Sequence, residues 1–195
     1  MKNSNTCRII LLLYCKNNYK YVTKEKQILL VLRAQTGDLE AYNTLLKSIQ
    51  TKVYWYIWKL LNDKSLADDI LQEVFIKIFR KLSLLRQPEF FLPWVFRITT
   101  RELFRHLKKQ RIKYESSLEE DSIDTYNIEE DKADIDVEKL ARLIDKLSPA
   151  SRAVITLHYN EEMTIKEISD VLEIPTGTVK SRLSYGLKML RAGYG

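Results

Sequence analysis

Side chains that donate hydrogen bonds fill the stretch between Thr176 and Arg191, and no acidic residue interrupts them. Amines, guanidinium groups and hydroxyls donate to phosphate oxygens and to base edges, whereas a carboxylate on the same surface would repel phosphate. The chemistry that these residues favour is therefore the binding of duplex DNA. The candidate contacts are Thr178, Lys180, Ser181, Arg182, Ser184, Tyr185 and Lys188.

A helix, a tight turn and a second helix must position these side chains. Thr164, followed three residues later by Glu167, forms a capping-box pattern that predicts the start of the first helix. The residues Glu173-Ile174-Pro175 break the apolar pattern, and Thr176 offers a second N-cap. The spacing predicts a helix-turn-helix, and a surface hairpin in any all-helical protein is the alternative. The predicted inner face of the second helix is Val179, Leu183, Leu187 and Leu190.

A second cationic surface is predicted upstream. Arg97, Arg101, Arg105 and Lys108 recur at intervals of three or four residues, which places them along one face of a helix. Aromatic residues lie in or beside this stripe, and the unstacked bases of single-stranded DNA stack on aromatic faces. A solvated charged face and an aromatic core are the alternatives. The aromatic residues are Phe90, Phe91, Trp94, Phe96 and Phe104.

The segment before this stripe predicts an amphipathic helix with a polar outer face. Ser65 is its expected N-cap, with Asp68 at the third helical position. The predicted inward residues are Ile70, Leu71, Val74, Phe75, Ile78 and Phe79, and the predicted outward residues are Asp69, Gln72, Glu73 and Lys77. Trp55, in the helix before it, is expected to lie in the core.

Charge is distributed unevenly along the chain. The 32 Lys and Arg residues exceed the 26 Asp and Glu residues by six, yet residues 115–138 hold 11 acids and one base. This segment has few aliphatic residues to bury, so it is predicted to be a flexible acidic linker that could also shield the basic surfaces. A short acidic helix on a basic neighbour is the alternative. The predicted segments are an N-terminal extension, residues 1–23, a helical domain, 24–113, the linker, 114–136, and the helix-turn-helix domain, 137–195.

The composition predicts an all-α fold of two small domains. Only five Gly and four Pro occur in 195 residues, and no sustained period-two pattern or repeat is found. With two His and no metalloprotease, phosphate-loop or nucleophile-elbow motif, no catalytic residue, metal or cofactor is expected. Cys7 and Cys15 are too few for a disulfide framework, which fits a reducing cytoplasm.

The N-terminal extension carries a short apolar run, residues 9–15. It is too short to span a bilayer and lacks a small-residue cleavage site. The expectation is that the translation start is assigned too far upstream and that the true start lies near Val22. A tail that contacts a membrane is the alternative.

The order of these pieces resembles a known family. DDILQE, then WVFRI, an acidic linker and a terminal IPTGTVKSRL look like a bacterial RNA polymerase sigma factor of the extracytoplasmic-function (ECF) group. The resemblance covers about residues 24–191, and the combination is far more specific than any one motif. The alternative is a helix-turn-helix regulator that binds duplex DNA without acting as a polymerase subunit.

The resemblance implies partners and sites. Core RNA polymerase, through the clamp of its largest subunit, would bind Asp69, Gln72, Glu73 and Phe75. The minus-10 element of promoter DNA would meet Arg86, Phe90, Trp94, Arg97, Arg101 and Arg105. The minus-35 element would meet the seven residues from Thr178 to Lys188 named above. An anti-sigma factor is a further expected partner.

The chain departs from the family pattern at two places. Family members often carry Asn and Asp where this chain has Arg101 and Arg105, and often Arg-Ala where it has Tyr185-Gly186. Glycine lowers helix stability by about 1 kcal/mol relative to alanine, so Gly186 is expected to loosen the second helix.

Overall fold

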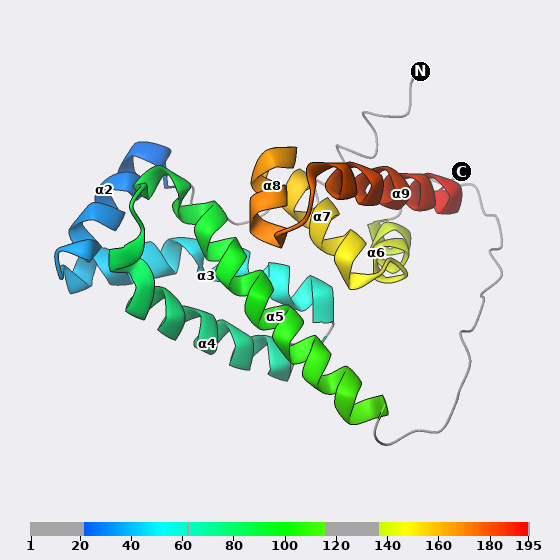
Figure 1. Ribbon diagram of the computed structural model, residues 1–195, viewed down its shortest axis with the longest axis horizontal. Helices are drawn as coiled ribbons and strands as arrows, with labels where there is room; N and C mark the ends of the chain where they lie inside the picture. Colours follow the sequence, from blue (N-terminus) through cyan, green and yellow to red (C-terminus); the bar gives the residue numbers. More distant parts are fainter. Residues whose placement is uncertain (1–21, 62, 116–136, 195) are drawn as a thin grey trace.

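The computed structural model describes residues 22–61, 63–115 and 137–194, and within these ranges the chain is helical, with no strand. The predictions for the N-terminal extension and for the acidic linker concern residues that lie almost entirely outside them. The all-α prediction is confirmed (Figure 1). The elements are α2 (Lys24–Gln35), α3 (Leu39–Leu61), α4 (Lys64–Lys81), the short 3-10 helices η1 (Leu82–Leu84) and η2 (Pro88–Phe90), α5 (Phe91–Glu115), α6 (Val137–Asp145), α7 (Pro149–Tyr159), α8 (Ile165–Leu172) and α9 (Thr176–Tyr194).

Local capping sets the helix starts. The predicted capping box is confirmed: the Thr164 hydroxyl accepts from the Glu167 amide at 3.2 Å, and the Glu167 carboxylate accepts from the Thr164 amide at 2.8 Å. The N-cap predicted for α4, Ser65, was wrong by two positions, because Asp63 caps the helix by accepting from the Leu66 amide at 3.0 Å. Thr176 is the first residue of α9 rather than the residue before it.

The N-terminal unit, α2 to α5, is built around the long helix α3. Tyr56 of α3 is fully buried; its ring meets that of Phe96 edge-on, with centroids 5.3 Å apart, and its hydroxyl lies 2.8 Å from that of Thr100. Two core predictions were wrong, since Trp55 and Phe79 are 40% and 59% exposed. The apolar stripes of α3 and α4 are wider than the surface their neighbours cover, so these rings stay at the edge of the core.

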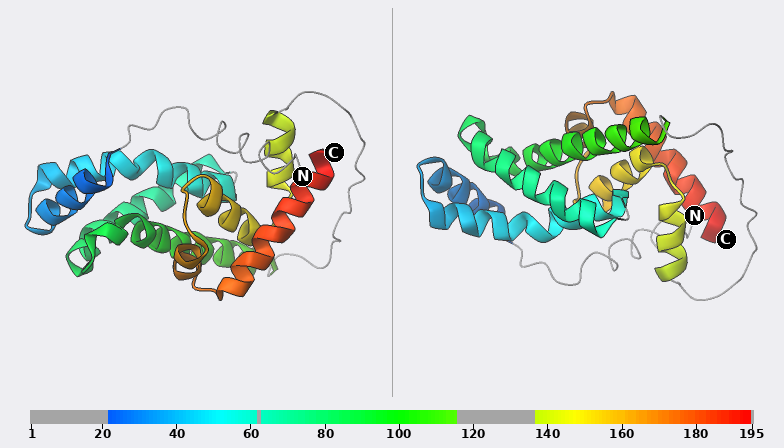
Figure 2. Two further views of the ribbon diagram at one scale, coloured as in Figure 1. Left: turned by 90° about the horizontal axis from the view of Figure 1, so that it is seen from above. Right: turned by 90° about the horizontal axis from the view of Figure 1, so that it is seen from below.

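The C-terminal unit, α6 to α9, packs directly against the N-terminal unit. Helix α8 lies against α5 and α7 against α3, as the views in Figures 1 and 2 show. One core cluster runs through both units. The two units are therefore in contact rather than held apart. The C-terminal residues in the shared cluster include Ala153, Val154, Leu157, Ile168, Val171 and Val179.

Candidate nucleic-acid interface

Helix α9 presents the predicted duplex-binding residues. Its inner residues Val179 and Leu190 are buried against the unit's core. The Ser181 hydroxyl donates to the Thr178 carbonyl at 3.0 Å, which fixes its direction near the start of the helix. Of the seven candidates, Thr178 and Arg182 are half-buried, and Lys180, Ser181, Ser184, Tyr185 and Lys188 are exposed.

Gly186 has a packing role in α9. A Cβ atom added there would lie 2.4 Å from Ile155 Cδ1 and 3.7 Å from Leu147 Cδ1, both in the small core cluster of the C-terminal unit. The residue is buried and the helix continues through it to Tyr194. Gly186 thus allows α9 to approach α7 closely. The expected loosening at this position is not what the structure shows.

This close approach predicts coupling between Gly186 and Ile155. We expect Gly186→Ala to lower the free energy of unfolding in the wild-type background. In an Ile155→Val background, the effect of Gly186→Ala on that free energy should be more favourable by about 0.5 to 2 kcal/mol, because valine lacks Cδ1. Urea unfolding of the four proteins of this double-mutant cycle measures the coupling. Gly177→Ala is the matched control, since no atom lies within 4 Å of its added Cβ. Additive effects at 186 and 155 would contradict the close approach.

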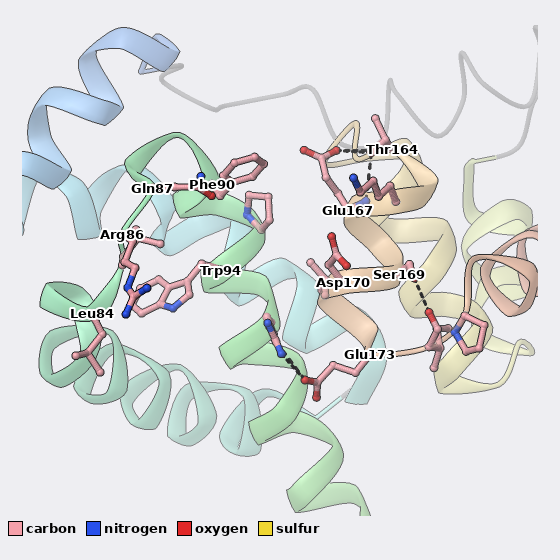
Figure 3. Close-up of a pocket in the computed structure, with 17 residues that line it drawn as sticks. Leu84, Arg86, Gln87, Phe90, Trp94, Thr164, Glu167, Ser169, Asp170 and Glu173 are labelled. Atoms are coloured by element: carbon pink, nitrogen blue, oxygen red, sulfur yellow. Dashed lines mark hydrogen bonds and ion pairs between the residues drawn. The ribbon is translucent and has the colours of Figure 1, made fainter.

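A groove runs between the N-terminal unit and α8. Its volume is about 1000 Å³. Arg86, Phe90, Trp94 and Arg97, four of the six candidates for single-stranded DNA, line one wall. Figure 3 shows Arg86, Phe90 and Trp94 on one side and Thr164, Glu167, Asp170 and Glu173 of the C-terminal unit across from them. The structure thus gathers cations and aromatic rings on one wall of the groove, and carboxylates face them from the other wall.

Glu173 binds two of the candidate arginines. Its Oε1 accepts from Arg97 Nη2 at 2.6 Å and from Arg101 Nη2 at 2.5 Å, and its Oε2 accepts from Arg101 Nε at 3.0 Å. These hydrogen bonds, with that from Arg101 the larger influence and that from Arg97 next, lower the pKa of the Glu173 carboxyl to about 2. Local sequence patterns give no sign that Glu173 pairs with these arginines, because the partners are more than 70 positions apart along the chain.

Arg105 and Glu73, two further candidates, bind one another across α4 and α5. Arg105 donates to Glu102 Oε2 at 2.9 Å and also binds the Glu73 carboxylate, which lies 3.2 Å from His106 Nε2. These contacts join α4 to α5, so Arg105 turns toward α4 and Glu73 toward α5. Of the predicted protein-contact residues, Asp69 and Gln72 are exposed and Phe75 is half-buried.

The described ranges contain neither a candidate metal site nor a candidate membrane-spanning helix. No group of three His, Cys, Asp or Glu residues there could hold a metal ion. His158 lies with Nδ1 3.0 Å from the Met163 carbonyl, a contact that ties down the end of α7. Among the helices of these ranges, none has the length and apolar character needed to cross a bilayer.

Two family models match the chain: Sigma-70 region 2 over residues 45–112 and Sigma-70, region 4 over residues 137–190. The chain is 28% identical over 174 residues to the RNA polymerase sigma-H factor of Pseudomonas aeruginosa, covering 83% of this chain and 90% of that protein. It is 27% identical over 173 residues to the ECF RNA polymerase sigma factor SigW of Bacillus subtilis, covering 83% and 92%. With the ECF RNA polymerase sigma-E factor of Haemophilus influenzae it shares 29% identity over 174 residues, covering 83% and 91%.

Two solved structures share the fold. CnrH, in complex with the cytosolic domain of CnrY, superposes with a TM-score of 0.61 at 20% identity, covering 85% of this chain and 95% of that one. The sigma factor RpoE from Bartonella quintana, in complex with the anti-sigma factor NepR, also gives 0.61, at 17% identity, covering 77% and 94%.

Proposed function

Because this chain belongs to the sigma-70 family of RNA polymerase sigma factors, in its ECF group, we propose which of its surfaces carry out promoter-directed initiation. As a sigma factor, it directs core RNA polymerase to promoters. The region 2 match over residues 45–112 disfavours the alternative of a regulator that works without polymerase, since such a regulator needs only the helix-turn-helix. We propose that the chain catalyses no reaction of its own. We also propose that it acts in the cytoplasm, where core polymerase acts.

The exposed side of α9 is the proposed reader of the minus-35 element. The observation that carries this is the row of exposed donors on one helix that has no acidic residue from Thr176 to Arg191. A helix of this kind fits the major groove of B-DNA, where its donors reach base edges and phosphates. Lys180 and Arg182 are the strongest donors near its start.

The N-terminal unit carries the other two proposed surfaces. Arg86, Phe90, Trp94, Arg97 and Arg101 form the proposed minus-10 surface, where aromatic rings receive unstacked bases and guanidinium groups bind phosphates. Asp69 and Gln72 on α4 form the proposed contact with the polymerase clamp, with Phe75 beside them. Glu73 and Arg105 support these surfaces by joining α4 to α5. An anti-sigma factor is the proposed regulator, as for the RpoE structure that shares this fold.

Replacing Lys180 or Arg182 by alanine is expected to weaken binding to minus-35 duplex DNA by about 1 to 3 kcal/mol. A base contact would also relax selectivity at one position, whereas a phosphate contact would weaken binding to all sequences alike. Fluorescence anisotropy at one fixed salt concentration measures both effects. Lys146→Ala, an exposed lysine before α7, removes the same charge outside α9 and should change little. Wild-type binding by both α9 variants would mean that this helix does not enter the groove.

A further inference from the structure

We propose that Gln35, the last residue of α2, is a positioning residue for minus-10 recognition. Its side-chain amide binds the stretch between α4 and α5, residues 82–90 (the minus-10 loop), which presents Arg86 and Phe90. The inference rests on the proposed function, which assigns these two side chains to promoter DNA. Gln35 is thus expected to control which bases the loop accepts without touching DNA itself.

Two hydrogen bonds join Gln35 to the minus-10 loop. Its Nε2 lies 2.9 Å from the Leu82 carbonyl oxygen and 2.7 Å from the Leu85 carbonyl oxygen, although these residues are 47 and 50 positions away along the chain. A carboxamide nitrogen carries two N–H groups, so one donates to each carbonyl. The Leu85 amide also donates to the Leu82 carbonyl at 3.1 Å. Gln35 therefore bridges the first residue of η1 and the residue that follows this helix.

The bond to Leu85 sets the direction in which Arg86 leaves the core. The Leu85 carbonyl and the Arg86 amide belong to one planar peptide unit, so holding the oxygen fixes the orientation of that plane. Leu85 has left the helical conformation, with φ −74° and ψ 102°, and Gln35 supplies a donor to its carbonyl. The exposed Arg86 side chain therefore starts from a peptide plane that α2 holds in place.

The minus-10 loop has little regular structure of its own to hold its shape. Its two 3-10 helices, η1 and η2, are three residues long each, and the hydrogen bonds inside such helices have poor geometry. Leu82 and Leu85 anchor the start of the loop in the core, whereas Leu84 and Phe90 are 71% and 46% exposed. The exposed part therefore depends on its anchors for its orientation, and Gln35 supplies a polar anchor.

Helix α2 gives Gln35 a rigid base. This helix packs against α3 and lies beside both η1 and η2 (Figure 1). Val31, one turn before Gln35, is fully buried. The turn after Gln35 is closed by Asp38, which accepts from Arg33 Nε at 2.8 Å and from the Ala41 amide at 2.9 Å. The position of the Gln35 amide is therefore set by contacts outside the proposed DNA surface.

Gln35→Glu tests the proposal, because a carboxylate has the shape of the carboxamide and lacks both N–H donors. Gln35→Met removes the donors without adding a charge, so it serves as a second test if the glutamate variant is unfolded. Gln50→Glu is the matched control, since it makes the same change at an exposed position on α3. Circular dichroism checks the fold of each full-length variant.

The readout is base selectivity, which a smaller amount of folded protein does not by itself alter. Holoenzyme is assembled from the full-length chain and core RNA polymerase. It is mixed with forked DNA that is double-stranded at the minus-35 element and single-stranded at the minus-10 element, with the bases of both elements randomised. Sequencing of the bound DNA gives, at each position, the ratio between the most and the least favoured base. Hydrogen exchange of the peptide that covers the minus-10 loop, measured on the free chain, reports on the loop itself.

Both Gln35 variants should flatten the strongest minus-10 preference by about 3- to 30-fold, because losing two neutral hydrogen bonds lowers the fraction of chains with a correctly placed loop. The minus-35 preferences should stay as in the wild type. Amide exchange in the loop should accelerate, since the Leu85 and Phe90 amides donate to carbonyls within it. Gln50→Glu should match the wild type in both measurements. This combination supports the proposal.

Unchanged minus-10 preferences in both Gln35 variants would overturn the inference. If Arg86→Ala with Phe90→Ala then flattens these preferences, the loop reads bases without the help of Gln35 and the proposed function stands. If that double variant also leaves them unchanged, the minus-10 assignment of the loop fails as well. Equal flattening at minus-10 and minus-35 would show a general role of Gln35 in folding, which also contradicts a positioning role.

Discussion

The double variant Asp69→Lys with Gln72→Lys is expected to abolish association with core RNA polymerase. Both residues are exposed on α4, so the fold should survive the change. If they face a complementary basic surface on the clamp, two lysines there would create like-charge contacts that cost several kcal/mol, enough to weaken binding by about 100-fold or more. Glu73 is left intact because its carboxylate binds Arg105 and His106 within the chain.

Pull-down of core enzyme and a duplex-binding assay on the same protein measure this effect. Binding to minus-35 duplex should persist, since α9 is untouched. Glu40→Lys with Asn43→Lys on α3 is the matched control, because it makes the same changes at the same spacing on another exposed helix face. Normal association by the Asp69 and Gln72 variant would place the clamp contact elsewhere, and failure of the wild type to bind core enzyme would contradict the sigma assignment.

The substitution Lys52→Met is expected to lower the free energy of unfolding by about 3 kcal/mol near neutral pH, because it leaves a buried carboxylate without its cation. The Glu161 side chain is only 8% exposed, and Lys52 Nζ lies 3.4 Å from its Oε2 across the contact between α3 and α7. That carboxylate oxygen makes no hydrogen bond in the structure, so the lysine's charge is its main compensation. Lys52 therefore helps to hold the two units together.

The loss should depend on pH with a defined sign. Burial raises the pKa of the Glu161 carboxyl, and Lys52 opposes this rise. Between the unfolded and the raised folded pKa, the folded state binds more protons, so stability falls as pH rises through that window. Removing Lys52 raises the folded pKa further and extends the window upward. The deficit relative to wild type should thus be larger at about pH 8 than at about pH 5.

Urea unfolding at both pH values measures this difference. Lys47→Met, at an exposed position on the same helix, should have little effect at either pH. Adding Glu161→Gln to Lys52→Met should recover most of the lost stability, because no charge then remains buried. An equal deficit at both pH values would mean that Glu161 is not the group that responds.

The elements of this protein follow from short-range patterns in its sequence. The capping box of Thr164 and Glu167 is formed as predicted, because its hydrogen bonds join residues three positions apart. The exposed donors of α9 and the stripe of Arg97 and Arg101 follow from helical periodicity, which sorts residues between core and solvent whatever the partner helices are. The same reasoning was wrong for Phe79, since periodicity does not tell how much of an apolar stripe a neighbour covers.

The relations between elements depend on packing across long stretches of chain. Glu173 meets Arg97 and Arg101 only because α8 packs against α5, and a carboxylate at a helix end carries no local sign of such a partner. Gly186 looks like a weak point in a helix until α7 is placed beside it, where the missing side chain makes room for Ile155. Local propensity acts within a few residues, whereas these contacts depend on how whole helices fit together, and for that reason they became visible only in the folded arrangement.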